Sequence, residues 1–223
     1  MVTEVIRIAC LHTAQSNIAV FEAARLGLGE VLLTHAVRAD LLASAEAVGG
    51  LSAAIAAETR VVLADLARDA DVVLLTCSTL GPSVDSEISS VPILRGDAAL
   101  ARAAVGVGGK VVVLCAAPTT LGPTRDLYLA LATGSEAKID IRLVRGAWER
   151  FKAGDHSAYQ ALIAAAADQA SREGADCVAL AQASMAPAAA LTCERPPPLT
   201  SPRAGLVAAL VAAQAGSLTG GAV

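Results

Sequence analysis

The sequence predicts an α/β protein made of two pseudo-symmetric domains, each built on a parallel β-sheet. Two observations support this fold class. Short apolar runs alternate with longer amphipathic segments along the whole chain, and one half of the chain resembles the other. Strands that alternate with helices form parallel sheets joined by right-handed crossovers.

The strands are predicted from short apolar runs rich in β-branched residues, a pattern typical of strands that are buried on both faces. Residues 196–200, which include three consecutive prolines, are expected to be extended. In chain order, the predicted strands span residues 4–11, 31–37, 71–76, 91–94, 110–115, 138–144 and 176–181.

The helices are predicted from the segments between these strands, which end at glycines and begin at capping residues. A polar turn at residues 12–17 can cap the first helix, and Gly27 and Gly29 end it. A further short helix is expected after Pro82, because proline suits a first helical position. In chain order, the other predicted helices span residues 18–26, 40–48, 52–68, 97–105, 123–132, 146–152, 156–172 and 204–215.

An internal repeat relates the two halves of the chain. Residues 71–82 resemble residues 176–187 at an offset of 105 positions (176 − 71 = 105), and the same offset pairs Cys10 with Cys115. Several separated matches on one offset indicate two similar α/β halves. We expect the first domain to span residues 1–95 with 200–223, and the second to span residues 96–199.

Composition excludes several classes of function. The net charge is -4, and no basic patch interleaved with aromatic residues is present, so we expect no nucleic-acid partner. No apolar run reaches the ~18 residues that a membrane-spanning helix needs. The N-terminus has no basic segment followed by a long apolar core, so we expect a cytoplasmic protein without a signal peptide.

The cysteines and histidines do not predict a metal site. The five cysteines form no C-x-x-C pair, and their odd number argues against a disulfide framework. His12, His35 and His156 lie far apart in the sequence, without the spacing of metal ligands. We therefore expect no metal and no structural zinc, and we expect His35 and His156 to lie at the surface.

Cys77 is the first candidate for a catalytic residue. It follows an apolar run that begins at Asp71, and Gly81 and Pro82 break the strand pattern after it. Cys77 should therefore lie where a parallel strand ends and a helix begins, the edge at which open α/β sheets bind ligands. Backbone N–H groups and the helix N-terminus at such an edge favour a thiolate and a bound carboxylate.

The repeat predicts which turns share a site with Cys77. Two similar halves related by a pseudo-twofold axis would bring corresponding strand ends to one cleft, which we expect to be the active site. In that cleft, His12 could serve as a proton donor. The residues expected to bind substrate are polar or lie in the same turns: Thr13, Ser78, Thr79, Thr119, Thr120, Gln182, Ala183 and Ser184. None of the predicted turns holds Lys or Arg, so a monocarboxylate is favoured over a dicarboxylate.

Four segments resemble the aspartate/glutamate racemase superfamily, which includes hydantoin racemases. They span most of the chain in the order expected for that family: residues 74–79, 91–97, 112–114 with 119–120, and 180–186. The resemblance implies two α/β domains, no cofactor, a cleft between the domains as the active site, and commonly a dimer. It also implies that two cysteines flank the substrate carbon, one thiolate removing a proton and the opposite thiol returning one.

The sequence departs from this pattern at the second cysteine. Cys77 fills the first position, but Gln182 stands at the second, and an amide does not exchange protons at useful pH. The leading hypothesis is a cofactor-independent racemase or isomerase that acts on a small carboxylic acid or amino-acid derivative through Cys77. The alternatives are a single-thiol lyase or decarboxylase, and a small-carboxylate binding protein without catalysis on the same scaffold.

Overall fold

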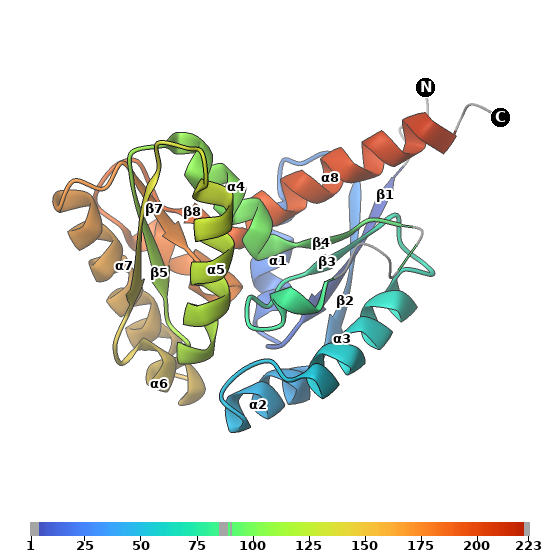
Figure 1. Ribbon diagram of the computed structural model, residues 1–223, viewed down its shortest axis with the longest axis horizontal. Helices are drawn as coiled ribbons and strands as arrows, with labels where there is room; N and C mark the ends of the chain where they lie inside the picture. The colour runs from blue at the N-terminus through green and yellow to red at the C-terminus, as the bar shows by residue number, and fades with distance from the viewer. Residues whose placement is uncertain (1–4, 85–88, 90, 221–223) are drawn as a thin grey trace. The chain divides into compact units, whose positions relative to one another are not determined.

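The computed structural model describes residues 5–84, 89 and 91–220, apart from the side chains of residues 216–220. The chain divides into two compact units, Met1–Gly96 with Pro202–Val223, and Asp97–Ser201. Each unit holds a four-stranded sheet in which all strands are parallel, flanked by helices (Figure 1). The predicted α/β class with two parallel-sheet domains is confirmed.

The first unit has the strand order β2-β1-β3-β4. Its strands are β1 (Ile6–His12), β2 (Val31–Val37), β3 (Val72–Leu75) and β4 (Ile93–Arg95). Its helices are α1 (Asn17–Arg25), α2 (Ala39–Ala47), α3 (Ala53–Leu66), α8 (Ser201–Gly220) and the 3-10 turn η1 (Gly81–Ser83).

The two faces of the first sheet pack against different helices. Ala9, Leu11 and Leu75 belong to one buried cluster with residues of α2 and α3. Side chains alternate along a strand, so Cys10 and His12 point to the opposite face. Phe21 of α1 contacts the His12 ring there, with ring centroids 5.0 Å apart. The face that α1 covers also holds polar side chains, among them His12.

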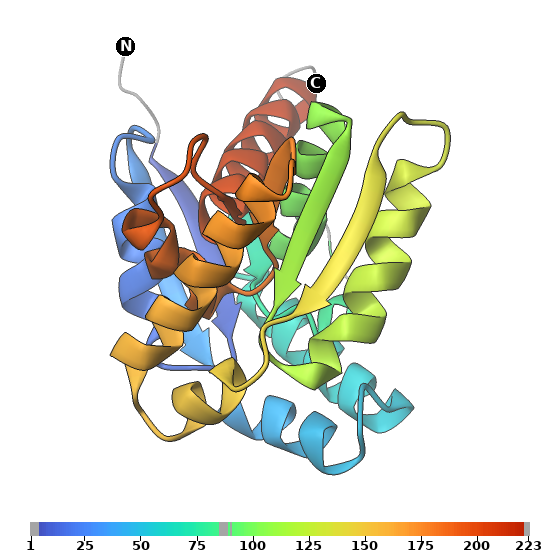
Figure 2. The same cartoon turned by 90° about the vertical axis from the view of Figure 1, so that its left-hand side faces the viewer.

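The second unit has the strand order β6-β5-β7-β8. Figure 2 shows helices α5 and α7 on opposite sides of its strands. Its strands are β5 (Lys110–Cys115), β6 (Lys138–Leu143), β7 (Cys177–Leu180) and β8 (Leu199–Thr200). Its helices are α4 (Gly96–Val107), α5 (Leu121–Ala132), α6 (Ala147–Lys152) and α7 (His156–Arg172), with 3-10 segments η2 (Pro118–Thr120) and η3 (Ala183–Leu191).

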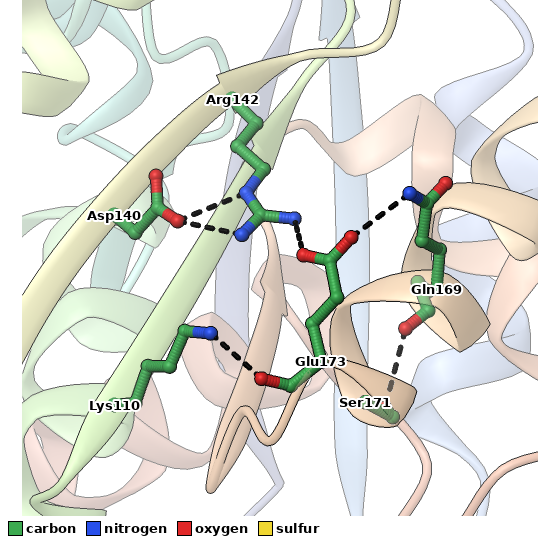
Figure 3. A network of polar contacts seen from close by, with 7 residues as sticks. Lys110, Asp140, Arg142, Gln169, Ser171 and Glu173 are labelled. Atoms are coloured by element: carbon green, nitrogen blue, oxygen red, sulfur yellow. Dashed lines mark hydrogen bonds and ion pairs between the residues drawn. The ribbon is translucent and has the colours of Figure 1, made fainter.

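A polar network joins the C-terminal end of α7 to the second sheet (Figure 3). Arg142 on β6 contacts Asp140 at 2.7 Å and Glu173 at 2.7 Å. The Nζ atom of Lys110 donates to the backbone oxygen of Glu173 at 2.8 Å, and Gln169 donates to its carboxylate at 2.9 Å. These groups are partly exposed, so the network orients α7 more than it stabilises the unit.

The repeat is present in the sheets, but its offset differs between strands. Ile8 pairs with Val72 in the first unit, and Val111 pairs with Cys177 in the second. The third strands are thus 105 positions apart (177 − 72 = 105), whereas the first strands are 103 apart (111 − 8 = 103).

The predicted pairing of Cys10 with Cys115 is therefore wrong, because the register makes His12 the counterpart of Cys115. The connection between the first and third strands is two residues longer in the second unit. Loops accept such insertions, whereas a shift of register inside a buried strand would move its side chains to the wrong positions.

An aspartate before the third strand fixes this register in both units. Asp71 Oδ2 accepts a hydrogen bond from the backbone N–H of Arg7 at 2.8 Å, and Asp176 Oδ2 accepts one from Lys110 at 2.7 Å. Gly109 precedes Lys110 with φ +64°, and a Cβ atom there would lie 2.3 Å from Asp176 Oδ2. Glycine is needed at that position for both reasons.

The helix expected after Pro82 is not formed at that point. Gly81–Ser83 is a single 3-10 turn, and Val84 after it is extended. Residues 85–88 and 90 lie outside the described part of the chain. The described residues after Cys77 thus hold a single 3-10 turn where a helix N-terminus was expected. Among the described residues, no helix is both long and apolar enough to cross a membrane.

Candidate functional site

Cys77 lies at the carboxyl edge of the first sheet, two residues after β3 ends at Leu75. Its side chain is half-buried, whereas Cys10, Cys115 and Cys177 are buried and Cys193 is exposed. Thr13, Ser78 and Thr79 from the two turns at this edge are buried. The first unit thus places a partly accessible thiol at the same sheet edge as hydroxyl-bearing turns that follow two adjacent strands.

A chain of hydrogen bonds runs beneath this edge, on the face of the sheet that α1 covers. Glu22 Oε1 lies 3.1 Å from His35 Nε2, and His35 Nδ1 lies 2.9 Å from His12 Nε2. His12 Nδ1 lies 2.9 Å from Thr76 Oγ1, and Thr76 donates from its hydroxyl to the backbone oxygen of Leu11 at 2.9 Å. The chain therefore ends at the residue that immediately precedes Cys77.

Donor and acceptor roles in this chain follow from Thr76. Its one hydroxyl hydrogen goes to Leu11, so Thr76 Oγ1 accepts a hydrogen from His12 Nδ1. His12 Nε2 is then an acceptor toward His35. Burial, followed by the neighbouring His35, lowers the pKa of His12 to about 3, so its ring is neutral at ordinary pH.

The structure places the predicted proton donor deeper than the sequence suggested. His12 is the last residue of β1 rather than a turn residue, and its side chain is fully buried. Both of its ring nitrogens are engaged, one by Thr76 and one by His35. In this arrangement, hydrogen bonds connect His12 to the edge of the sheet only through Thr76.

The equivalent edge of the second unit is organised by Gln182. Its side-chain oxygen accepts hydrogen bonds from the backbone N–H groups of Ala116 and Ala117, at 2.6 and 2.8 Å. Gln182 lies two residues after β7 ends at Leu180, as Cys77 lies two residues after β3. At the position that corresponds to Cys77, the second unit thus holds a side chain that closes its own turn.

The other predicted residues of the second unit lie around this turn. Thr119 and Thr120 form part of η2, and Thr120 is buried. Ala183 is buried at the start of η3. The hydroxyl of Ser184 lies 2.8 Å from that of Tyr159, so it is already hydrogen-bonded within the unit.

Sequence reasoning missed the polar contacts of the first unit. His35 was expected at the surface, but its side chain is only 12% exposed because it lies between His12 and Glu22. His12 and His35, which lie far apart in the sequence, are hydrogen-bonded to each other in the fold. The spacing of Cys10 and His12, two apart on a strand, was the available signal that they share one face.

These residues also form a group that could hold a metal ion. One ligand atom from each of Cys10, His12 and His35 lies within 4.8 Å of the other two. The sequence led us to expect no metal, because it does not show that β2 brings His35 beside β1.

Comparisons with known proteins identify the fold. No family model matches the sequence, and no curated protein matches it either. Among solved structures, the aspartate racemase of Picrophilus torridus is similar with a TM-score of 0.74, at 14% identity over 94% of each chain.

Two further racemases show the same likeness. A glutamate racemase of Bacillus anthracis has a TM-score of 0.68 at 13% identity, over 94% of this chain and 82% of its own. The allantoin racemase of Pseudomonas fluorescens has a TM-score of 0.64 at 16% identity, over 95% and 92%. The chain therefore has the fold that these racemases share.

Proposed function

We propose that the protein is a cofactor-independent, racemase-type isomerase that belongs to the aspartate/glutamate racemase superfamily and acts on a small carboxylic acid or amino-acid derivative. Cys77 is the proposed acid/base. The observation that carries the proposal is the half-buried thiol of Cys77 at a strand end, in a fold shared with an aspartate, a glutamate and an allantoin racemase. The location of the substrate in a cleft between the two halves stays a prediction.

The proposed reaction begins with proton transfer from carbon to sulfur. The Cys77 thiolate removes the proton next to the substrate carboxylate, and the electron pair stays on the substrate as a carbanion. Such a carbanion forms only if hydrogen-bond donors stabilise the carboxylate as negative charge develops on it. The donors must be fixed in place before the proton moves.

The repeat suggests which donors these are. Ala116 and Ala117, whose N–H groups bind Gln182, correspond by register to Thr13 and Ala14. A cysteine at position 77 is too short to fill that place as glutamine does. We therefore propose that the N–H groups of Thr13 and Ala14 bind the substrate carboxylate, with the hydroxyls of Ser78 and Thr79 beside them.

Gln182 favours a second candidate, a lyase or decarboxylase with one thiol. Full racemisation needs a proton donor on the opposite face of the carbanion, and the oxygen of Gln182 is engaged with the backbone. Its amide nitrogen can donate a hydrogen bond but does not give up a proton at useful pH. A lyase needs one proton delivery only, so Cys77 alone would suffice.

Hydrogen exchange in deuterated water distinguishes these reactions. The protein is incubated with a panel of chiral monocarboxylates, amino acids, hydantoins and prochiral disubstituted malonates, and the α-hydrogen is followed by NMR together with optical rotation. Exchange with loss of rotation supports racemisation, and loss of carbon dioxide with deuterium in one configuration supports the lyase. Binding without exchange or release would show a binding protein.

The matched variants are Cys77→Ser and Cys193→Ser. Cys193 is the exposed cysteine, so its replacement controls for the general loss of a reactive thiol. We expect Cys77→Ser to lose exchange and Cys193→Ser to keep it. Full exchange by a folded Cys77→Ser protein would exclude Cys77 as the base.

A further inference from the structure

The cluster of Cys10, His12 and His35 follows from the geometry of two adjacent strands. Cys10 and His12 are two apart on β1, and His35 on β2 is the register partner of Cys10. In a parallel pair, these three side chains emerge on one face of the sheet. The ligand atoms of the three residues all lie within 4.8 Å of one another.

Both histidines are oriented by a partner on their far nitrogen. Thr76 Oγ1 lies 2.9 Å from His12 Nδ1, and Glu22 Oε1 lies 3.1 Å from His35 Nε2. As a result, His12 Nε2 and His35 Nδ1 point at each other, 2.9 Å apart. Metal-binding histidines have this outer support as a rule, because it fixes the tautomer and the ring orientation.

The second unit provides an internal control for this cluster. The positions that correspond by register to Cys10, His12 and His35 hold Val113, Cys115 and Ile141. The position of Thr76 holds Ala181, which is buried. The fold therefore requires no polar group there, and burial of polar groups opposes folding unless they gain partners.

We propose that Cys10, His12 and His35 bind one zinc ion inside the first unit. A thiolate and two imidazoles are the donors that zinc prefers, and three protein ligands leave a fourth position for water. Tetrahedral coordination with usual bond lengths places these donor atoms about 3.3 to 3.6 Å apart. The two nitrogens need to separate by about half an ångström from their present distance, and the sulfur needs to move toward them by no more than about 1.5 Å.

The charges of the cluster suit a divalent ion. With neutral imidazoles, the ion and the Cys10 thiolate carry one net positive charge, and the partly exposed carboxylate of Glu22, which also pairs with Arg25, faces it through His35. The ion would link β1 to β2. Through His12 it would also fix the position of Thr76, the residue that precedes Cys77. This site does not depend on the proposed function, since binding requires no reaction at Cys77.

Metal binding is tested on the whole chain after treatment with a chelator and buffer exchange. Zinc is titrated in competition with a chromophoric chelator, and cobalt is added as a spectroscopic probe. We expect one equivalent of zinc to bind, a raised melting temperature, and a thiolate-to-cobalt charge-transfer band. The matched variants are Cys10→Ser and Cys115→Ser, which remove buried cysteines from the first strand of each unit.

The band should be lost in Cys10→Ser and kept in both Cys115→Ser and Cys77→Ser. His35→Gln, at a less buried position, gives the same test if Cys10→Ser does not fold. Glu22→Gln should weaken zinc binding by about 10- to 100-fold through the loss of outer support. Equal zinc affinity in wild type and His35→Gln would overturn the proposal. So would a charge-transfer band that is lost in Cys77→Ser and kept in Cys10→Ser.

Discussion

Gln182 is predicted to hold together the turn of residues 116–117 in the second unit, and its replacement tests that role directly. The oxygen of Gln182 accepts two backbone hydrogen bonds, at 2.6 and 2.8 Å. Both donors, on Ala116 and Ala117, belong to residues that are almost completely buried. Gln182→Met keeps the length and approximate volume of the side chain but removes the acceptor.

The size of the effect follows from the two donors. A buried N–H group without a partner destabilises the folded state by about 1 to 3 kcal/mol. Two such groups would sum to about 2 to 6 kcal/mol, and we expect about 2 to 4 kcal/mol because one of them can gain a water molecule in the altered turn. Gln182→Glu retains an acceptor and is expected to lie within about 1 kcal/mol of wild type, since a carboxylate binds N–H groups strongly.

The assay combines urea unfolding with amide hydrogen exchange measured by NMR. Exchange at Ala116 and Ala117 reports the turn itself, so it remains informative if the two units unfold separately. We expect faster exchange at both amides in Gln182→Met and slow exchange in Gln182→Glu. If Gln182→Met shows wild-type stability and unchanged exchange at both amides, Gln182 does not hold the turn.

Two further predictions concern the second unit. Gly109→Ala should destabilise the second unit by about 2 kcal/mol or more, because Gly109 combines a positive φ with close approach to Asp176. The measurement is thermal unfolding. Gly134→Ala is the control, since Gly134 has a positive φ but open space around it. Asp168→Asn should lower the free energy of unfolding by about 1.5 to 3 kcal/mol at pH 7, because the carboxylate accepts hydrogen bonds from the backbone N–H groups of residues 193–194. These bonds lower the pKa of Asp168 in the folded state, so its contribution is present above the ordinary carboxyl pKa and is lost as the pH falls through the lower folded value. The difference between wild type and Asp168→Asn in urea titrations should therefore shrink in acid, and a difference that is constant with pH would contradict this role.

Local sequence patterns predicted most of the fold because most strand residues of the two sheets are apolar. The strands at 31–37 and 110–115 and the helix at 156–172 have the predicted bounds. At Pro82 the described residues form a 3-10 turn in place of the expected helix. Proline suits both structures, and the neighbouring residues do not distinguish them. The offset predicted for the first strands was wrong because the sequence pattern does not reveal a two-residue insertion in a loop.

The candidate site could be predicted only where a single strand end defines it. The position of Cys77 at a strand end was predicted because a strand pattern stops beside it. The contacts of His35 with His12 and Glu22 depend on the register between β1 and β2 and on the side of the sheet that α1 covers. The residues near His35 in the sequence indicate neither the register nor the covered side, which is why His35 was expected at the surface.

The two units have the same strand order but differ in what they place at equivalent positions, and this difference bears on the proposed reaction. In the first unit, Cys77 lies above a chain of polar residues that ends at Glu22. In the second unit, Gln182 binds its own backbone, and apolar side chains occupy the place of the polar chain. Proton transfer is therefore expected from one side of the substrate only. If so, exchange of the α-hydrogen with solvent should be faster than inversion, whereas a scaffold with two thiols would make the two rates similar.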